Sequence, residues 1–174
     1  MFRPRNTTCF SFALIACAAL AGAQSTIVDV KVHSAGLEHN LLGDPADQAV
    51  SIFLPAAYAR DAQRRFPVLY FLHGYPDPTP RHAAAECMRT SLDNLIAAGS
   101  AQPFLIVLPN GLNKYLGASY ANSPTTGNWD DYVTRDVVRY IDSRYRTLAD
   151  PAHRVIAGHS MGGIRRAHPL LPPP

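Results

Sequence analysis

The chain has few cysteines, no block of basic residues and no apolar run that comfortably spans a membrane. Only three cysteines occur in 174 residues, and two of them, Cys9 and Cys17, fall in an N-terminal leader. The third, Cys87, could then form no internal disulfide, and we expect it on a helix face as a small apolar residue. None of the seven histidines has metal-ligand spacing to another His or Cys, so we predict neither a metal nor another cofactor.

Charge is nearly balanced once the leader is set aside. Removing Arg3 and Arg5 from the 16 basic residues leaves 14 against 13 acidic ones. No stripe of basic and aromatic residues occurs, which excludes nucleic acid as an expected partner. The chain is 47% apolar and 17% charged, a composition that suits one globular domain.

Residues 1–23 have the pattern of an export signal. A short positive segment precedes the apolar run 10–20, and Ala21-Gly22-Ala23 is a small-x-small cleavage site. We predict a periplasmic or secreted protein with no stable membrane span after cleavage. A membrane anchor and a lipoprotein box ending at Cys17 are the alternatives.

Strands buried on both faces are indicated by two continuous apolar runs. The expected strands cover residues 27–33, 49–54, 68–72, 104–108 and 155–157. They alternate with helical patterns, which predicts an α/β domain with a mainly parallel sheet and flanking helices over residues 24–163.

The helical patterns have recognisable ends. One helix is expected over 83–98, closed by Gly99, and a second begins after a cap at Asn128. The segment 55–65 is expected to be a polar loop. His73-Gly74-Tyr75, Pro109-Asn110-Gly111 and Ser160 each follow a strand, at the sheet edge where α/β proteins bind ligands.

The segment Arg154–Gly163 carries the most specific chemistry. A short apolar strand leads into Gly158-His159-Ser160-Met161-Gly162, the Gly-x-Ser-x-Gly pattern of a serine hydrolase nucleophile elbow. Such a turn is crowded, so Gly158 and Gly162 would remove clashing side chains and Gly163 would add clearance. The Met161 N–H would face the developing oxyanion. A glycine-rich turn that contains a serine by chance is the alternative.

Four blocks together resemble one family. The runs FPVLYFLHGYPD, IVLPNG, YANSPTTGNWDDYVTRDVVRYIDSRYRT and RVIAGHSMGG are similar to the "Putative esterase" family of α/β-hydrolases, over roughly residues 27–163. That family includes esterase D-like S-formylglutathione hydrolases, feruloyl and acetyl-xylan esterases, siderophore esterases and mycolyltransferases.

The resemblance implies roles for particular residues. Ser160 would be the acyl-accepting nucleophile, and the backbone N–H groups of Tyr75 and Met161 would form the oxyanion hole. His73 and Gly74 would shape the oxyanion loop; His73 as a base is the alternative.

Three further residues have weaker implied roles. His159, inside the elbow, would be structural. Asn122 and Trp129 could line the pocket wall, although for Trp129 we favour packing in the core as a residue at a helix start.

After Gly163 the sequence departs from the family. Residues 164–174 form an aberrant proline-rich tail, and the acid and histidine of the triad, which would follow Ser160, are absent. His168 would lie about 12 Å along a helix from Ser160, pointing away from it. We therefore expect a fold truncated after the elbow.

Three functions remain open at this point. The first is a cofactor-free serine carboxylic-ester hydrolase, inactive or very weak in this form, acting on a small-molecule or carbohydrate-linked ester. The second is a non-catalytic protein that binds an acyl group or a carbohydrate. The third is an acyltransferase of the same family.

Overall fold

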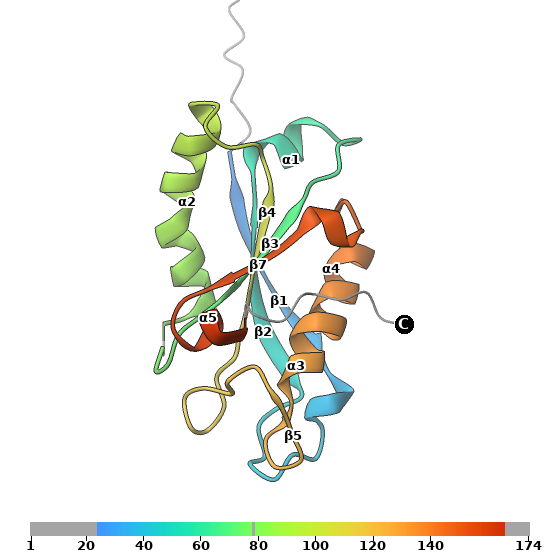
Figure 1. Cartoon of the computed structure of the whole chain (residues 1–174). Coiled ribbons are helices and arrows are strands. Elements are labelled where there is room, and N and C mark those ends of the chain that lie inside the picture. Colours follow the sequence, from blue (N-terminus) through green and yellow to red (C-terminus); the bar gives the residue numbers. More distant parts are fainter. Residues whose placement is uncertain (1–23, 78, 166–174) are drawn as a thin grey trace, which may run out of the picture.

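Five strands form one mixed sheet in the computed structural model, which describes residues 24–77 and 79–165 (Figure 1). The strand order is β1-β2-β4-β3-β7, and the ladders of β1 with β2 and of β2 with β4 are antiparallel. Strands β4, β3 and β7 run parallel. The strands are β1 (Thr26–His33), β2 (Asp47–Leu54), β3 (Val68–Leu72), β4 (Leu105–Pro109) and β7 (Arg154–Gly158).

Helices cover both faces of this sheet, which confirms the predicted α/β class (Figure 1). The main helices are α2 (Arg81–Ala97), α3 (Trp129–Asp131), the π-helical η2 (Tyr132–Val137) and α4 (Val138–Arg144), the last three continuous in the chain. Shorter elements are η1 (Ala35–Leu37), α1 (Ala56–Arg60), the two-residue strands β5 (Asn122–Ser123) and β6 (Gly127–Asn128), η3 (Pro151–His153) and α5 (Met161–Arg165).

The two faces are packed unequally. On one face, Phe53, Ile106 and Leu108 meet the partly buried Met88 and Leu92 of α2. On the other, a larger cluster joins the alternate strand residues to the helices, and its largest members are Tyr70, Tyr120, Trp129 and Tyr132. Burial along β3 alternates from one residue to the next, because successive side chains point into the helix layers on opposite faces of the sheet.

Four details differ from expectation. The sheet is mixed rather than mainly parallel, because β2 runs against both of its neighbours, an orientation that an apolar run does not encode. The segment 55–65 contains helix α1. Leu95 is spaced with Met88 and Leu92 as the apolar face of a helix would be, yet it is 48% exposed, and Cys87 is exposed on the same helix.

Among the described residues, no helix has the length and apolarity needed to cross a membrane. The predicted leader, residues 1–23, lies outside the described residues, as does the part of the proline-rich tail from residue 166 onward.

Candidate active site

Ser160 lies on the sharp turn between β7 and α5 and is exposed to solvent. Its φ of 50° is in the left-handed region, which a residue with a Cβ rarely adopts. Such strain persists only where the surrounding structure imposes it, and it concentrates at functional sites. The backbone therefore has the sharp strand-to-helix turn expected of a nucleophile elbow.

Two glycines make this turn possible. A Cβ on Gly158 would lie 2.5 Å from the backbone carbon and oxygen of Gly162. A Cβ on Gly162 would overlap the Leu72 carbonyl at the end of β3. Gly163 differs, because its added Cβ would meet only the Gly158 carbonyl, with the oxygen at an ordinary 3.5 Å. The extra clearance expected from Gly163 is thus not needed.

The elbow is attached to the end of β3 and to the loop that follows it. The His159 N–H donates to the Leu72 carbonyl at 3.1 Å, and the Gly162 N–H donates to the His73 carbonyl at 3.2 Å. Gly74 lies directly against the elbow, since a Cβ there would be 2.8 Å from His159 Nδ1 and 3.3 Å from Ser160 Cβ. The structure thus brings the His73-Gly74 segment next to Ser160.

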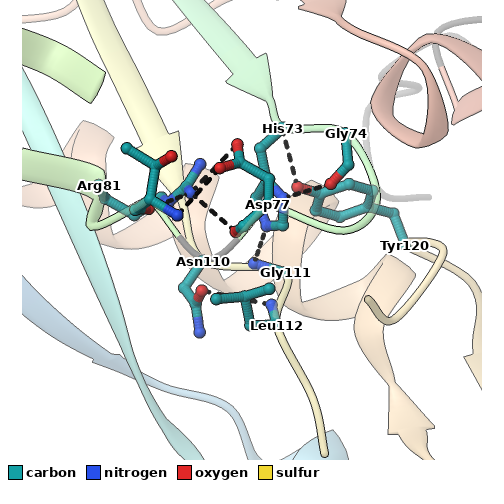
Figure 2. Close-up of polar contacts among 9 residues, drawn as sticks. His73, Gly74, Asp77, Arg81, Asn110, Gly111, Leu112 and Tyr120 are labelled. Carbon is teal, nitrogen blue, oxygen red and sulfur yellow. Dashed lines mark hydrogen bonds and ion pairs between the residues drawn. The ribbon is translucent and has the colours of Figure 1, made fainter. Parts of the chain in front are cut away.

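Both ring nitrogens of His73 are already engaged. Nδ1 lies 2.8 Å from the Gly74 carbonyl oxygen, and Nε2 accepts the Gly111 N–H at 2.9 Å (Figure 2). The side chain is buried, and burial lowers the pKa of the imidazole from its ordinary value. A ring held this way has no free nitrogen to accept a proton from Ser160, which argues against His73 as a base.

Two side chains next to the elbow are tied together by the loop after β4. Met161, which follows Ser160, is buried, whereas Tyr75, which follows Gly74, is 58% exposed. Gly117 joins them, because a Cβ on it would lie 2.6 Å from the Tyr75 ring and 2.9 Å from Met161 Sδ. The loop after β4 therefore packs on the loop after β3 at the rim of the elbow.

Asn122 and Trp129 stabilise the start of helix α3. Trp129 is fully buried in the core and its Nε1–H donates to the Thr126 carbonyl at 2.7 Å. The Asn122 side-chain oxygen accepts the N–H groups of Asp130 and Asp131, at 3.0 and 3.1 Å. The cap comes from Asn122 across a two-strand hairpin, and Asn128, the predicted cap, makes no such bond.

Sequence reasoning missed Tyr120 and Arg81. Tyr120 is buried with a φ of 47°, and its hydroxyl accepts the His73 N–H at 3.0 Å. Arg81, whose side chain is 5% exposed, pairs with Asp77 at 3.3 Å and donates to the Thr79 carbonyl. Figure 2 shows both groups around the loop after β3. A left-handed backbone at a tyrosine has no local sequence pattern, so the position of Tyr120 could not be predicted from this sequence alone.

A cavity of about 380 Å³ lies beside this cluster, lined among others by Asp29, Ser51, Arg81 and His82. Three of its polar groups bond to one another: Ser51 Oγ donates to Asp29 at 2.6 Å, and His82 Nδ1 lies 2.8 Å from the other Asp29 oxygen. Ser160 is not part of its lining.

Among residues 24–77 and 79–165, no imidazole hydrogen-bonds to the Ser160 hydroxyl. In the same part of the chain, no three His, Cys, Asp or Glu side chains are grouped to hold a metal ion. His168, discussed above, lies outside the described residues.

Comparison with curated proteins finds esterases. The chain is 30% identical over 120 residues to an endo-1,4-β-xylanase/feruloyl esterase of Xylanibacter ruminicola, covering 67% of this chain and 16% of the relative. It is 31% identical over 124 residues to an esterase of Mycobacterium tuberculosis, covering 66% and 24%. The chain thus spans less than a quarter of each of these relatives.

Solved structures give the same fold. A ferulic acid esterase superposes with a TM-score of 0.68 at 30% identity, covering 82% of this chain and 51% of that one. An S-formylglutathione hydrolase from Agrobacterium tumefaciens, at 17% identity, gives a TM-score of 0.58 with 81% and 51% coverage. The chain spans about half of each of these structures.

A family model matches over residues 45–165, which include the loops after β3 and β4 and the elbow. This match covers well over half of the chain, and it confirms the resemblance noted in the sequence. The chain belongs to the "Putative esterase" family.

Proposed function

We propose that the chain is a serine carboxylic-ester hydrolase in which Ser160 attacks the ester carbonyl and carries the acyl group. The observation that carries this proposal is the exposed Ser160, whose backbone is left-handed and which lies against Gly74. The tight turn that holds it there has room only for glycine at positions 158 and 162. Nucleophilic serine needs this exposure, and an ordinary serine turn does not need the strain.

The oxyanion would be stabilised by two backbone amides. Met161 begins α5, so its N–H has no acceptor in an earlier helical turn. The Tyr75 N–H belongs to the peptide that follows Gly74, which lies against Ser160. Two such donors contribute a few kcal/mol to the tetrahedral intermediate, since one donor alone is worth about 3 kcal/mol.

Proton transfer would limit the rate. The Ser160 hydroxyl must lose its proton as it attacks, and no imidazole of the described residues bonds to it. Serine without a positioned base keeps the weak nucleophilicity of an alcohol. We therefore propose slow hydrolysis by this chain, in which solvent water takes the Ser160 proton and protonates the leaving alcohol. A second water then attacks the acyl group and releases the acid from Ser160.

The proposed substrates are esters of aromatic acids, linked to a small alcohol or to a carbohydrate. The exposed Tyr75 offers an aromatic surface close to Met161 of the elbow. Two proteins similar to this chain are named for ferulic acid or feruloyl esters. No cofactor takes part in this mechanism.

The test is hydrolysis of methyl ferulate and methyl acetate by the full chain. We expect slow release of ferulate that disappears in Ser160→Ala and persists in Ser119→Ala. Ser119 is a matched control because it is also exposed and has a φ of 53°. Equal rates for Ser160→Ala and the unchanged chain would rule the hydrolase out. Transfer of feruloyl to an added sugar in preference to water would assign an acyltransferase instead.

We also propose that the protein is exported, on the basis of residues 1–23. The expected mature chain begins at Gln24, which N-terminal sequencing of protein secreted from a bacterial host would detect. Retention of lipidated Cys17 would replace this proposal with a membrane-anchored lipoprotein.

A further inference from the structure

The sheet face that α2 covers changes from apolar to polar along β1 and β2. Ile27 and Phe53 stand opposite each other in the ladder and belong to the cluster packed against α2. The next pair on the same face, two residues along, is Asp29 and Ser51. Helix α2 begins beside this polar pair, and a cavity remains between the start of the helix and the two strands.

This cavity, of about 380 Å³, is lined by both apolar and polar side chains. Ala49, Pro80 and Leu112 supply apolar surface, and the polar side chains include Asp29 and Asn110. The volume lies at the lower end of the range for small-molecule sites, about 300–1,000 Å³. The size therefore suits a ligand with a single small ring.

Both signs of charge occur in the lining, and each charged group already has a partner. Asp29 lies against His82, with 2.8 Å between a carboxylate oxygen and Nδ1. Arg81 pairs with Asp77 at 3.3 Å, and its side chain is 5% exposed (Figure 2). An anion in the cavity would meet the Asp29 carboxylate, and a cation would meet the Arg81 guanidinium. A neutral ligand avoids both repulsions.

The polar groups keep hydrogen-bonding capacity for such a ligand. A carboxylate has about four lone-pair positions, and Asp29 uses two of them, for Ser51 Oγ at 2.6 Å and for His82 Nδ1. Because the carboxylate can only accept, His82 Nδ1 donates, and Nε2 of the neutral ring presents a lone pair. Asn110 Nδ2 carries two hydrogens and donates one of them to Gln48 at 2.7 Å.

Hydroxyl groups both donate and accept, so they match a lining of this kind. A sugar carries hydroxyls on neighbouring ring carbons, and two of them can reach the two oxygens of one carboxylate at once. The carbon atoms of its ring form an apolar face that suits Ala49, Pro80 and Leu112. Ser51 holds the Asp29 carboxylate before any ligand arrives, which lowers the cost of ordering it on binding.

We propose that this cavity is a binding site for one neutral sugar ring, either a free sugar or a unit of a polysaccharide, with Asp29 accepting hydrogen bonds from adjacent hydroxyls. The site is separate from the proposed active site, because Ser160 does not line the cavity. The loop after β3 borders both sites, since Gly74 lies against Ser160 and Pro80 lines the cavity. The inference goes beyond the proposed function and does not depend on it.

The test is titration of the isotope-labelled full chain, followed by NMR, with the methyl glycosides of xylose, glucose, galactose, mannose and arabinose. At least one of them should shift the amides of residues 29, 51, 82 and 110–112, with a dissociation constant of about 1 mM. Ser160→Ala should bind equally well, so failure of the proposed hydrolase leaves this site standing. No such shifts with any glycoside, or equal shifts with sodium acetate or sodium phosphate, would overturn the inference.

Asp29→Ala tests the carboxylate, and Asp47→Ala is its matched control. Asp47 lies in the same ladder, bonds a histidine, His33, at 2.9 Å and is similarly exposed, but it does not line the cavity. Loss of hydrogen bonds to a charged group corresponds to about 10-fold or more in affinity, and we expect that loss in Asp29→Ala alone. Unchanged affinity in Asp29→Ala, or an equal loss in Asp47→Ala, would overturn the inference.

Ala49→Phe tests the cavity as a space. The added ring enters the cavity from an exposed position on β2. Lys31→Phe is the control, because Lys31 is the exposed partner of Ala49 on β1 and lies outside the lining. We expect sugar binding to be lost in Ala49→Phe and kept in Lys31→Phe, with circular dichroism showing that both variants fold. Equal affinities in the two folded variants would overturn the inference.

An oligosaccharide of the sugar that binds best separates the two sources. Tighter binding than the methyl glycoside, with shifts at the same amides, would identify a unit of a polysaccharide. Weaker binding would identify a free sugar, and either result supports the site. Shifts at residues 75 and 160–161 that leave residues 29 and 51 unchanged would place the sugar at the elbow and overturn the inference.

Discussion

Strands β4 and β7 are the two parallel neighbours of β3, yet they are buried to very different degrees. Every residue of β4 is buried, because β2 and β3 pair with its two edges and its side chains pack in the core clusters on both faces. Strand β7 pairs with β3 alone among the described residues, and its Val155 is 58% exposed. The elbow at the end of β7 is nevertheless well defined, since its constraints come from Leu72, His73 and Gly74 on the β3 side. The candidate site therefore depends on one edge of β7 only.

The largest expected contrast is in core truncation. Ile106→Ala in β4 removes a fully buried side chain, so we expect a loss of about 4 kcal/mol in unfolding free energy. Val155→Ala in β7 should change it by about 0.5 kcal/mol or less. Urea unfolding measures both. A loss at Val155 as large as at Ile106 would mean that β7 is covered in solution.

A second contrast lies inside the elbow. Gly162→Ala sets a methyl group against the Leu72 carbonyl, and overpacking of this kind costs about 3 kcal/mol. Gly163→Ala has room and should be neutral or slightly stabilising in helix α5. Thermal unfolding and fluorophosphonate labelling should both distinguish the pair, and equal behaviour would contradict the close approach of α5 to β3.

A third contrast concerns the helix that starts at Trp129. Asn122→Ala removes the oxygen that accepts two backbone N–H groups and should cost about 1 kcal/mol. Asn128→Ala removes no capping bond and is the matched control. The midpoints of denaturant unfolding compare the two variants. A larger loss of stability in Asn128→Ala than in Asn122→Ala would show that Asn128 is the cap, as the sequence predicted.

The smallest expected effect is a pH dependence from His73. Burial lowers its pKa in the folded chain, whereas an unfolded histidine titrates near about 6.5. Below that pH the unfolded chain binds a proton at His73 that the folded chain does not bind, so the free energy of unfolding falls as pH drops from 7 toward 5. His33 acts in the opposite sense, because its hydrogen bond to Asp47 raises its pKa at an exposed position.

The measurement is the slope of unfolding free energy against pH for the unchanged chain and for His73→Asn. We expect a smaller fall toward acid in the variant, since its side chain does not titrate. An identical slope would show that His73 does not resist protonation.

The sequence predicted those parts of the molecule that are set by local pattern. The apolar runs placed β3 and β4 to within a residue, and the elbow motif placed a turn whose glycine contacts fit the predicted crowding. The direction of β2 and the cap from Asn122 depend on residues far along the chain, so they were not predicted. The role of Tyr120 was not predicted for the same reason, because its partners, His73 and Gly111, lie in separate loops.

The most direct test of the central claim is peptide mapping of the adduct formed by a fluorophosphonate on the folded full chain. We expect a single modified serine, Ser160, that is labelled slowly, and we expect this labelling to disappear when the chain is first unfolded in urea. Labelling spread over several exposed serines at equal rates, or none at Ser160 in a chain that circular dichroism shows to be folded, would contradict it.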